Sequence, residues 1–127
     1  MKRAGAVLVL VLVLAGCGGS GGPSTFTLEK TRACLKKHPD VKLNRKLDFV
    51  ASTATGGALH AVLPKNAVTI VFGSTDGDAT NINEAYHRFV ARNVGIEDIL
   101  RQEKNVVLLF KDHPSDADLA TIENCLS

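Results

Sequence analysis

The sequence lacks a hydrophobic run long enough to cross a membrane. Its apolar stretch near the N-terminus is the 12-residue segment 4–15, which follows Lys2 and Arg3. A helix that spans a hydrocarbon core of about 30 Å needs about 20 apolar residues. The segment is therefore too short for a permanent transmembrane anchor. Its basic start and the small residues at its end are typical of a signal peptide that is removed.

The four residues that close this segment, Leu14-Ala15-Gly16-Cys17, resemble the lipobox of bacterial lipoproteins at every position. The resemblance implies cleavage before Cys17, a diacylglycerol thioether on its sulfur and usually an acyl chain, such as palmitate, on its new amino group. It also implies an extracytoplasmic location, with the covalent lipid on Cys17 holding the protein to a membrane of the cell envelope. Residues 1–16 are thus expected to be a removed signal peptide. Residues 17–26 would form a lipidated, flexible Gly/Ser tether to a single domain, 27–127.

The mature chain would have no excess of charge of either sign. The whole sequence has 15 Lys and Arg against 13 Asp and Glu, a net charge of +2. Because Lys2 and Arg3 would leave with the signal peptide, 13 basic residues would face 13 acidic ones. A nucleic-acid-binding domain needs a large basic excess. The balance therefore argues against nucleic acid as a partner.

Basic residues are nevertheless concentrated directly after the tether. Residues 30–46 contain one acid, Asp40, and seven basic residues: Lys30, Arg32, Lys36, Lys37, Lys42, Arg45 and Lys46. One interpretation is that this basic stretch rests on anionic lipid headgroups, each cation adding about 1 kcal/mol of binding free energy. The other is a solvated helix face whose charges pair with the acidic remainder of the chain.

The sequence has only three cysteines and no Cys-x-x-Cys motif. With Cys17 consumed by lipid, Cys34 and Cys125 remain as an even pair in an oxidising compartment, where disulfides persist. We expect them to be bonded. The bridge would close a loop of about 90 residues and stabilise the domain by up to about 4 to 5 kcal/mol. A catalytic thiol or a metal-ligand pair is the alternative role for the two residues.

Apolar periodicity predicts an α+β domain. Helical patterns occur at three places: 28–37 after an N-cap at Thr27, a segment after Asp78 or Thr80 that reaches Val90, and a segment after Ser115, where Asp118 completes a near-capping box. A short helical turn is expected near 96–100, and strands over 47–53, 58–63, 67–72 and 106–110. The order α-β-β-β-α-β-α predicts a two-layer sandwich with a mainly antiparallel four-stranded sheet.

Alternation along the predicted strands divides their side chains between two faces of the sheet. The first set is expected beneath the helices: Leu47, Phe49, Ala51, Leu59, Ala61, Leu63, Val68, Ile70, Phe72, Val106, Leu108 and Phe110. The second set is unusually apolar for a surface that meets only water: Val50, His60, Val62, Thr69, Val71, Val107 and Leu109. If all helices lie on the first face, the second is an exposed patch for a partner or ligand. The alternative is that one helix covers it.

The sequence lacks a coherent catalytic motif. Gly73-Ser74-Thr75-Asp76-Gly77 stands between a strand and a helix, as a nucleophile elbow would, but Thr75 replaces the serine and the domain is too small for that fold. The stretch that begins with Asp76 resembles a calcium loop, yet Thr80, Asn81 and His87 stand where other residues are required. No two of the four histidines have His-x-His or His-Glu-x-x-His spacing. We therefore expect no cofactor, no metal and no catalytic residue.

Together these features favour a non-enzymatic binding or assembly module of the cell envelope, anchored to a membrane by lipid. Its expected partner is an envelope protein, contacted through the second sheet face. A small envelope hydrolase or metal-dependent enzyme near Thr75, Asp76 and His87 is the alternative. A binder of anionic membrane surfaces, acting through the basic stretch at 30–46, is the third possibility.

Overall fold

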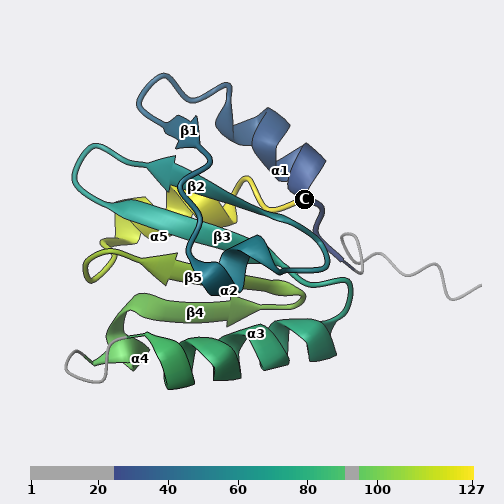
Figure 1. Cartoon of the computed structure of the whole chain (residues 1–127). Helices are drawn as coiled ribbons and strands as arrows, with labels where there is room; N and C mark the ends of the chain where they lie inside the picture. The colour runs from purple at the N-terminus through teal and green to yellow at the C-terminus, as the bar shows by residue number, and fades with distance from the viewer. Residues whose placement is uncertain (1–24, 91–94) are drawn as a thin grey trace, which may run out of the picture.

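The computed structural model describes residues 25–90 and 95–127, so the expected signal peptide, Cys17 and most of the tether lie outside the described residues. Figure 1 shows the strands at the centre of the domain with helices packed around them. Along the chain the elements are α1 (Leu28–Leu35), β1 (Lys42–Asn44), α2 (Phe49–Ser52), β2 (Ala58–Val62), β3 (Ala67–Phe72), α3 (Asp76–Phe89), α4 (Ile96–Ile99), β4 (Leu100–Glu103), β5 (Val106–Phe110) and α5 (Asp116–Glu123).

The strands form one sheet in the order β1-β2-β3-β5-β4, and every neighbouring pair is antiparallel. The predicted α+β class is therefore confirmed, with five strands in place of four. β2, β3 and β5 correspond to three of the predicted strands. The two edge strands, β1 and β4, were not predicted because they are short and polar, so they carry no alternating apolar pattern.

The strand predicted over 47–53 is wrong, because residues 49–52 of this segment form α2. Asp48 caps this helix by accepting a hydrogen bond from the backbone N–H of Ala51 at 2.8 Å. A short apolar run does not distinguish a strand from a buried helical turn, and here the capping carboxylate favours the turn. Phe49, expected in the core, is instead 77% exposed, while Val50 and Ala51 are buried.

Helices cover both faces of the sheet, so the domain has three layers and not the two predicted. α1 and α5 pack on the face that carries Leu59, Ile70 and Leu108, and this side holds the larger core. α2 and α3 pack on the other face, around Val71 and Val107. In Figure 1, α5 lies behind the sheet and α2 in front of it. The side chains of β2, β3 and β5 predicted to lie beneath helices are all buried in the larger core.

Local hydrogen bonds define where the helices begin. Thr27 caps α1 and Ser115 caps α5, both as predicted, and Ser115 forms a capping box with Asp118. α3 begins earlier than predicted, because its cap is Thr75, whose hydroxyl accepts from the backbone N–H of Asp78 at 3.1 Å. The Asp78 carboxylate in turn accepts hydrogen bonds from the backbone N–H of Ser74 and the hydroxyl of Thr55.

The two ends of the domain are joined. Cys34 at the end of α1 and Cys125 after α5 form the predicted disulfide, with their Cα atoms 5.3 Å apart. The backbone N–H of Thr27 also donates to the carbonyl of Ser127 at 2.6 Å. Among the described residues, every helix is too short or too polar to span a bilayer.

Candidate functional site

The second face of the sheet is not a continuous exposed patch. Val71 and Val107 are fully buried, and Thr69 is 8% exposed. Val50 belongs to α2 and packs with α3 against this face. The alternative considered above therefore applies, since the protein's own helices cover most of the predicted partner face.

A smaller apolar surface remains beside these helices. His60 and Leu109 are half-buried and Val62 is 37% exposed. His60 and Leu109 flank Thr69 in adjacent strands, and Val62 lies two residues further along β2. We call His60, Val62 and Leu109 the residual patch. Two exposed aromatic side chains stand on the covering helices, Phe49 at the start of α2 (77%) and Phe89 at the end of α3 (72%).

The residual patch carries no positive charge of its own at neutral pH. Burial and the nearby Lys46 ammonium lower the pKa of His60 below its usual value of 6.5. The Nδ1 atom of His60 lies 3.1 Å from the side-chain oxygen of Asn44, within hydrogen-bonding distance. Such a surface can accept an apolar partner.

A second feature is a groove of about 450 Å³ between α1 and the segment from β1 to β2. Three of its lining residues are cations, and none is acidic: Arg32 belongs to α1, Lys36 is the C-cap residue of α1, and Arg45 lies in the loop after β1. Its apolar lining includes Leu28, Leu43 and Leu47. We call this the cationic groove.

Among the described residues, no acidic side chain pairs with the cations of this groove. Within the described part of the chain, no ion pair holds Arg32, Lys36 or Arg45. Arg32 and Lys36 stand one helical turn apart, so they present two like charges on one face of α1. Pairing with the acidic remainder, one of the two interpretations of the basic stretch, is thus not observed for these three residues. Three unpaired cations beside apolar side chains can bind an anionic group that carries a hydrocarbon portion.

Comparison with protein families, with curated proteins and with solved structures finds no match to this chain.

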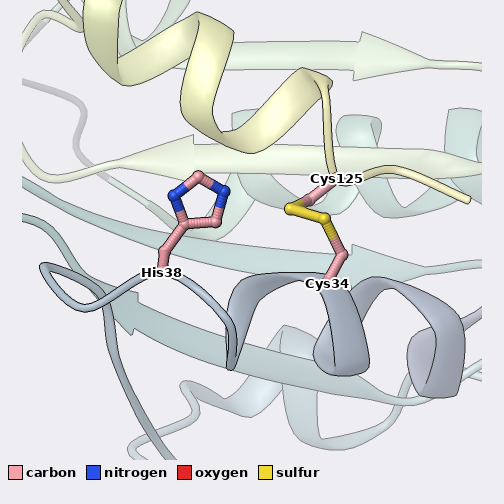
Figure 2. Close-up of side chains that lie close together, drawn as sticks. All are labelled: Cys34, His38 and Cys125. Carbon is pink, nitrogen blue, oxygen red and sulfur yellow. A yellow bond between two sulfur atoms is a disulfide. The ribbon is translucent and has the colours of Figure 1, made fainter.

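The third feature is a cluster formed around the disulfide. Figure 2 shows the imidazole of His38 beside the bond between Cys34 and Cys125. The two sulfurs and a ring nitrogen of His38 all lie within 4.8 Å of one another. Prediction from the sequence considered the cysteines and the histidines separately, so it did not find this cluster. The signal was the four-residue step from Cys34, in the last turn of α1, to His38, in the loop that follows this helix.

His38 also lines a groove of about 560 Å³. This groove lies between the loop after α1, the β2–β3 turn and the start of α5, and its lining includes Asp40, Lys65, His113 and Thr121. Asp118 lines it too, but its carboxylate is already engaged by the Ser115 backbone and the Asn66 side chain. His38 itself is exposed, so its imidazole is open to solvent in this groove.

The residues considered for an enzyme are not brought together. Thr75 caps the start of α3, and His87 lies in its last turn. Twelve residues of helix separate them by about 18 Å, at 1.5 Å per residue. Asp76 stays with Thr75 in the first turn, far from His87. The nucleophile elbow and the calcium loop are thus replaced by ordinary helix capping.

Proposed function

We propose that this protein is a lipid-anchored, non-enzymatic binding module of the bacterial cell envelope that contacts anionic lipid through the cationic groove. The Leu14–Cys17 lipobox supports the anchor. The unpaired charges of Arg32, Lys36 and Arg45 support the anionic ligand and are the observation that carries the proposal. Bound lipid would place its headgroup among these cations and apolar atoms against Leu28, Leu43 and Leu47.

The surroundings of the groove favour a membrane surface. Lys30, Lys37, Lys42 and Lys46 are exposed and extend the positive charge beyond the groove itself. Phe49, close in sequence to Arg45, is an exposed aromatic of the kind that inserts at the headgroup level of a bilayer.

The anchor would make even a weak contact effective. A Gly/Ser-rich tether of eight residues would have a root-mean-square length of about 16 Å, so the lipid would keep the domain at high local concentration near the bilayer. α1 is the first element after the tether, and this helix with its C-cap supplies two of the three groove cations, Arg32 and Lys36. The contact therefore orients the domain on a membrane that already holds it.

Co-sedimentation with vesicles tests the proposal. The mature chain carrying Cys17→Ser, which has no lipid, should bind vesicles that contain anionic lipid and should not bind neutral ones. The combined change Arg32→Gln, Lys36→Gln and Arg45→Gln should weaken binding at least about tenfold, since each cation contributes about 1 kcal/mol.

The matched control removes three exposed cations outside the basic stretch, through Lys65→Gln, Arg88→Gln and Lys111→Gln. It lowers the net charge equally and should keep most of the binding. Equal sedimentation with neutral and anionic vesicles, or equal losses in the two triple variants, would contradict a role for the groove.

An envelope protein that docks on the residual patch is the second candidate, favoured by the exposure of the apolar Val62 side chain. In-cell photo-crosslinking from Val62 and Leu109 tests it, with the buried Val71 as the negative position. A discrete adduct from Val62 or Leu109, absent from Lys36, would identify the partner. Absence of any adduct from the patch would leave the anionic-lipid contact as the binding role.

A further inference from the structure

The Cys34, His38 and Cys125 side chains form the one group of three metal-ligand types that lie close enough to share an ion in the described residues. Residues three or four apart commonly supply a pair of zinc ligands, and Cys34 and His38 have this spacing. His38 is exposed, and no hydrogen bond to another described residue holds its imidazole. The ring is therefore available to a ligand while it stands beside two sulfurs.

We propose that this cluster is a redox-gated zinc site: the oxidised protein carries the Cys34–Cys125 disulfide, and the reduced protein binds one Zn²⁺ through both thiolates and the His38 imidazole. The two states exclude each other, because the bonded sulfurs have no thiolate to offer. This inference does not depend on the proposed function, since the cationic groove contains none of the three ligands.

The exchange between the two states balances in two steps. A dithiol reductant transfers two electrons and two protons to the disulfide, giving the Cys34 and Cys125 thiols, and is itself oxidised to a disulfide. Zn²⁺ then displaces the two thiol protons, which pass to solvent, and takes the lone pair of neutral His38. Oxidation by a disulfide-forming catalyst reverses these two steps and releases the ion.

The distances suit zinc after a small rearrangement. Zinc sits about 2.3 Å from thiolate sulfur and about 2.0 Å from imidazole nitrogen, so ligand atoms in a tetrahedral site stand about 3.5 to 3.8 Å apart. The imidazole is already within 4.8 Å of both sulfurs, and the sulfurs must separate once their bond is broken. His38 also lines the 560 Å³ groove, so its imidazole is open to solvent.

Cobalt binding tests the site directly, because Co²⁺ occupies zinc sites and reports thiolate ligation by its visible and charge-transfer absorption. The mature chain with Cys17→Ser is reduced by a phosphine, freed of reductant without air and titrated with Co²⁺. We expect one tetrahedral Co²⁺ per chain in the reduced protein and none in the oxidised protein. Zn²⁺ should displace the cobalt and raise the Tm of the reduced protein by about 10 °C or more.

His38→Ala should weaken cobalt binding at least about tenfold. The matched control is His113→Ala, which removes another exposed histidine that precedes a proline and lines the same groove, and it should bind as the parent does. Absence of thiolate-to-cobalt absorption in the reduced parent, or equal affinity in His38→Ala, would overturn the site. A complex of two chains per ion, or one that persists unchanged in denaturant, would overturn it too, since the unfolded thiols would then be the ligands.

Discussion

Tyr86, the only tyrosine of the chain, connects two helices through one side-chain contact. Its hydroxyl donates to the Asp48 carboxylate, at 2.9 Å from Oδ2 and 3.1 Å from Oδ1. Burial, and then the charge and hydrogen bond of Asp48, raise the pKa of Tyr86 far above its usual value of 10. Because Asp48 also caps α2, a single carboxylate holds α2 and joins it to α3.

Tyr86→Phe should lower the free energy of unfolding by about 1.5 to 3 kcal/mol, because a hydrogen bond to a charged group is lost. Urea denaturation measures the change. In an Asp48→Asn background, where the acceptor is neutral, the same substitution should cost less. An unchanged denaturation midpoint in Tyr86→Phe would show that the contact adds no stability.

Glu103 makes stability depend on pH. Burial, together with a hydrogen bond and charge repulsion from Glu123, raises the pKa of Glu103 from 4.5 to about 7. The folded protein therefore holds a proton that the unfolded chain releases between these values. The unfolding free energy should fall as pH rises from about 4.5 to about 7.

Glu103→Gln removes the titrating group and should flatten this part of the profile, whereas Glu84→Gln, at an exposed glutamate of α3, should leave it in place. Denaturation midpoints at pH 5 and pH 8 give the comparison. An identical pH dependence in Glu103→Gln and the parent would assign the effect to another group.

At the scale of elements, α5 begins at a complete capping box. Ser115 and Asp118 each satisfy a backbone N–H of the other, and Asn66 from the β2–β3 turn donates to the same Asp118 carboxylate. Burial acts to raise the pKa of Asp118, but these hydrogen bonds outweigh it and lower the pKa below its usual value. The hydrogen bond from Asn66 to Asp118 therefore joins the start of α5 to the β2–β3 turn.

Ser115→Ala should lower the unfolding free energy by about 1 kcal/mol, the usual cost of losing an N-cap. Ser74→Ala, which changes an exposed serine in the loop before α3, should stay within about 0.5 kcal/mol of the parent. Thermal or urea denaturation measures the loss of unfolding free energy in each of the two variants. A loss no larger in Ser115→Ala than in Ser74→Ala would contradict the role of the box.

At the scale of the whole molecule, the Cys34–Cys125 bond closes the domain on itself. Its partners are 91 residues apart in sequence, so it removes much of the conformational freedom of the unfolded chain. The combined change Cys34→Ala and Cys125→Ala should lower the unfolding free energy by about 2 to 5 kcal/mol. Reduction of the parent without metal ions should cause a similar loss, and no loss in either experiment would contradict the prediction.

The proposed lipid anchor can be tested on the whole chain in a bacterial host. The parent should fractionate with membranes, and Cys17→Ser should move it to the soluble fraction, because no diacylglycerol is attached. Mass spectrometry of the membrane form should place the lipid on Cys17 as the first residue. A membrane-bound Cys17→Ser protein would contradict anchoring by this cysteine.

The candidate sites could be predicted only in part. The disulfide followed from counting cysteines, and the basic stretch was visible as a charge run, although its gathering into one groove was not. His60, Val62 and Leu109 of the predicted partner face stay accessible, whereas Val71 and Val107 do not. Strand alternation assigns a side chain to a face, but it does not say which helix covers that face.

The sequence by itself determined the α+β class, strands β2, β3 and β5, the caps Thr27 and Ser115, and the pairing of Cys34 with Cys125. Each of these depends on local periodicity, on side-chain to backbone hydrogen bonds or on counting. Tertiary structure alone decided that residues 49–52 form α2, that edges β1 and β4 join the sheet, and that His38 stands beside the disulfide. Those outcomes depend on contacts between distant segments, whose free energies no local pattern contains.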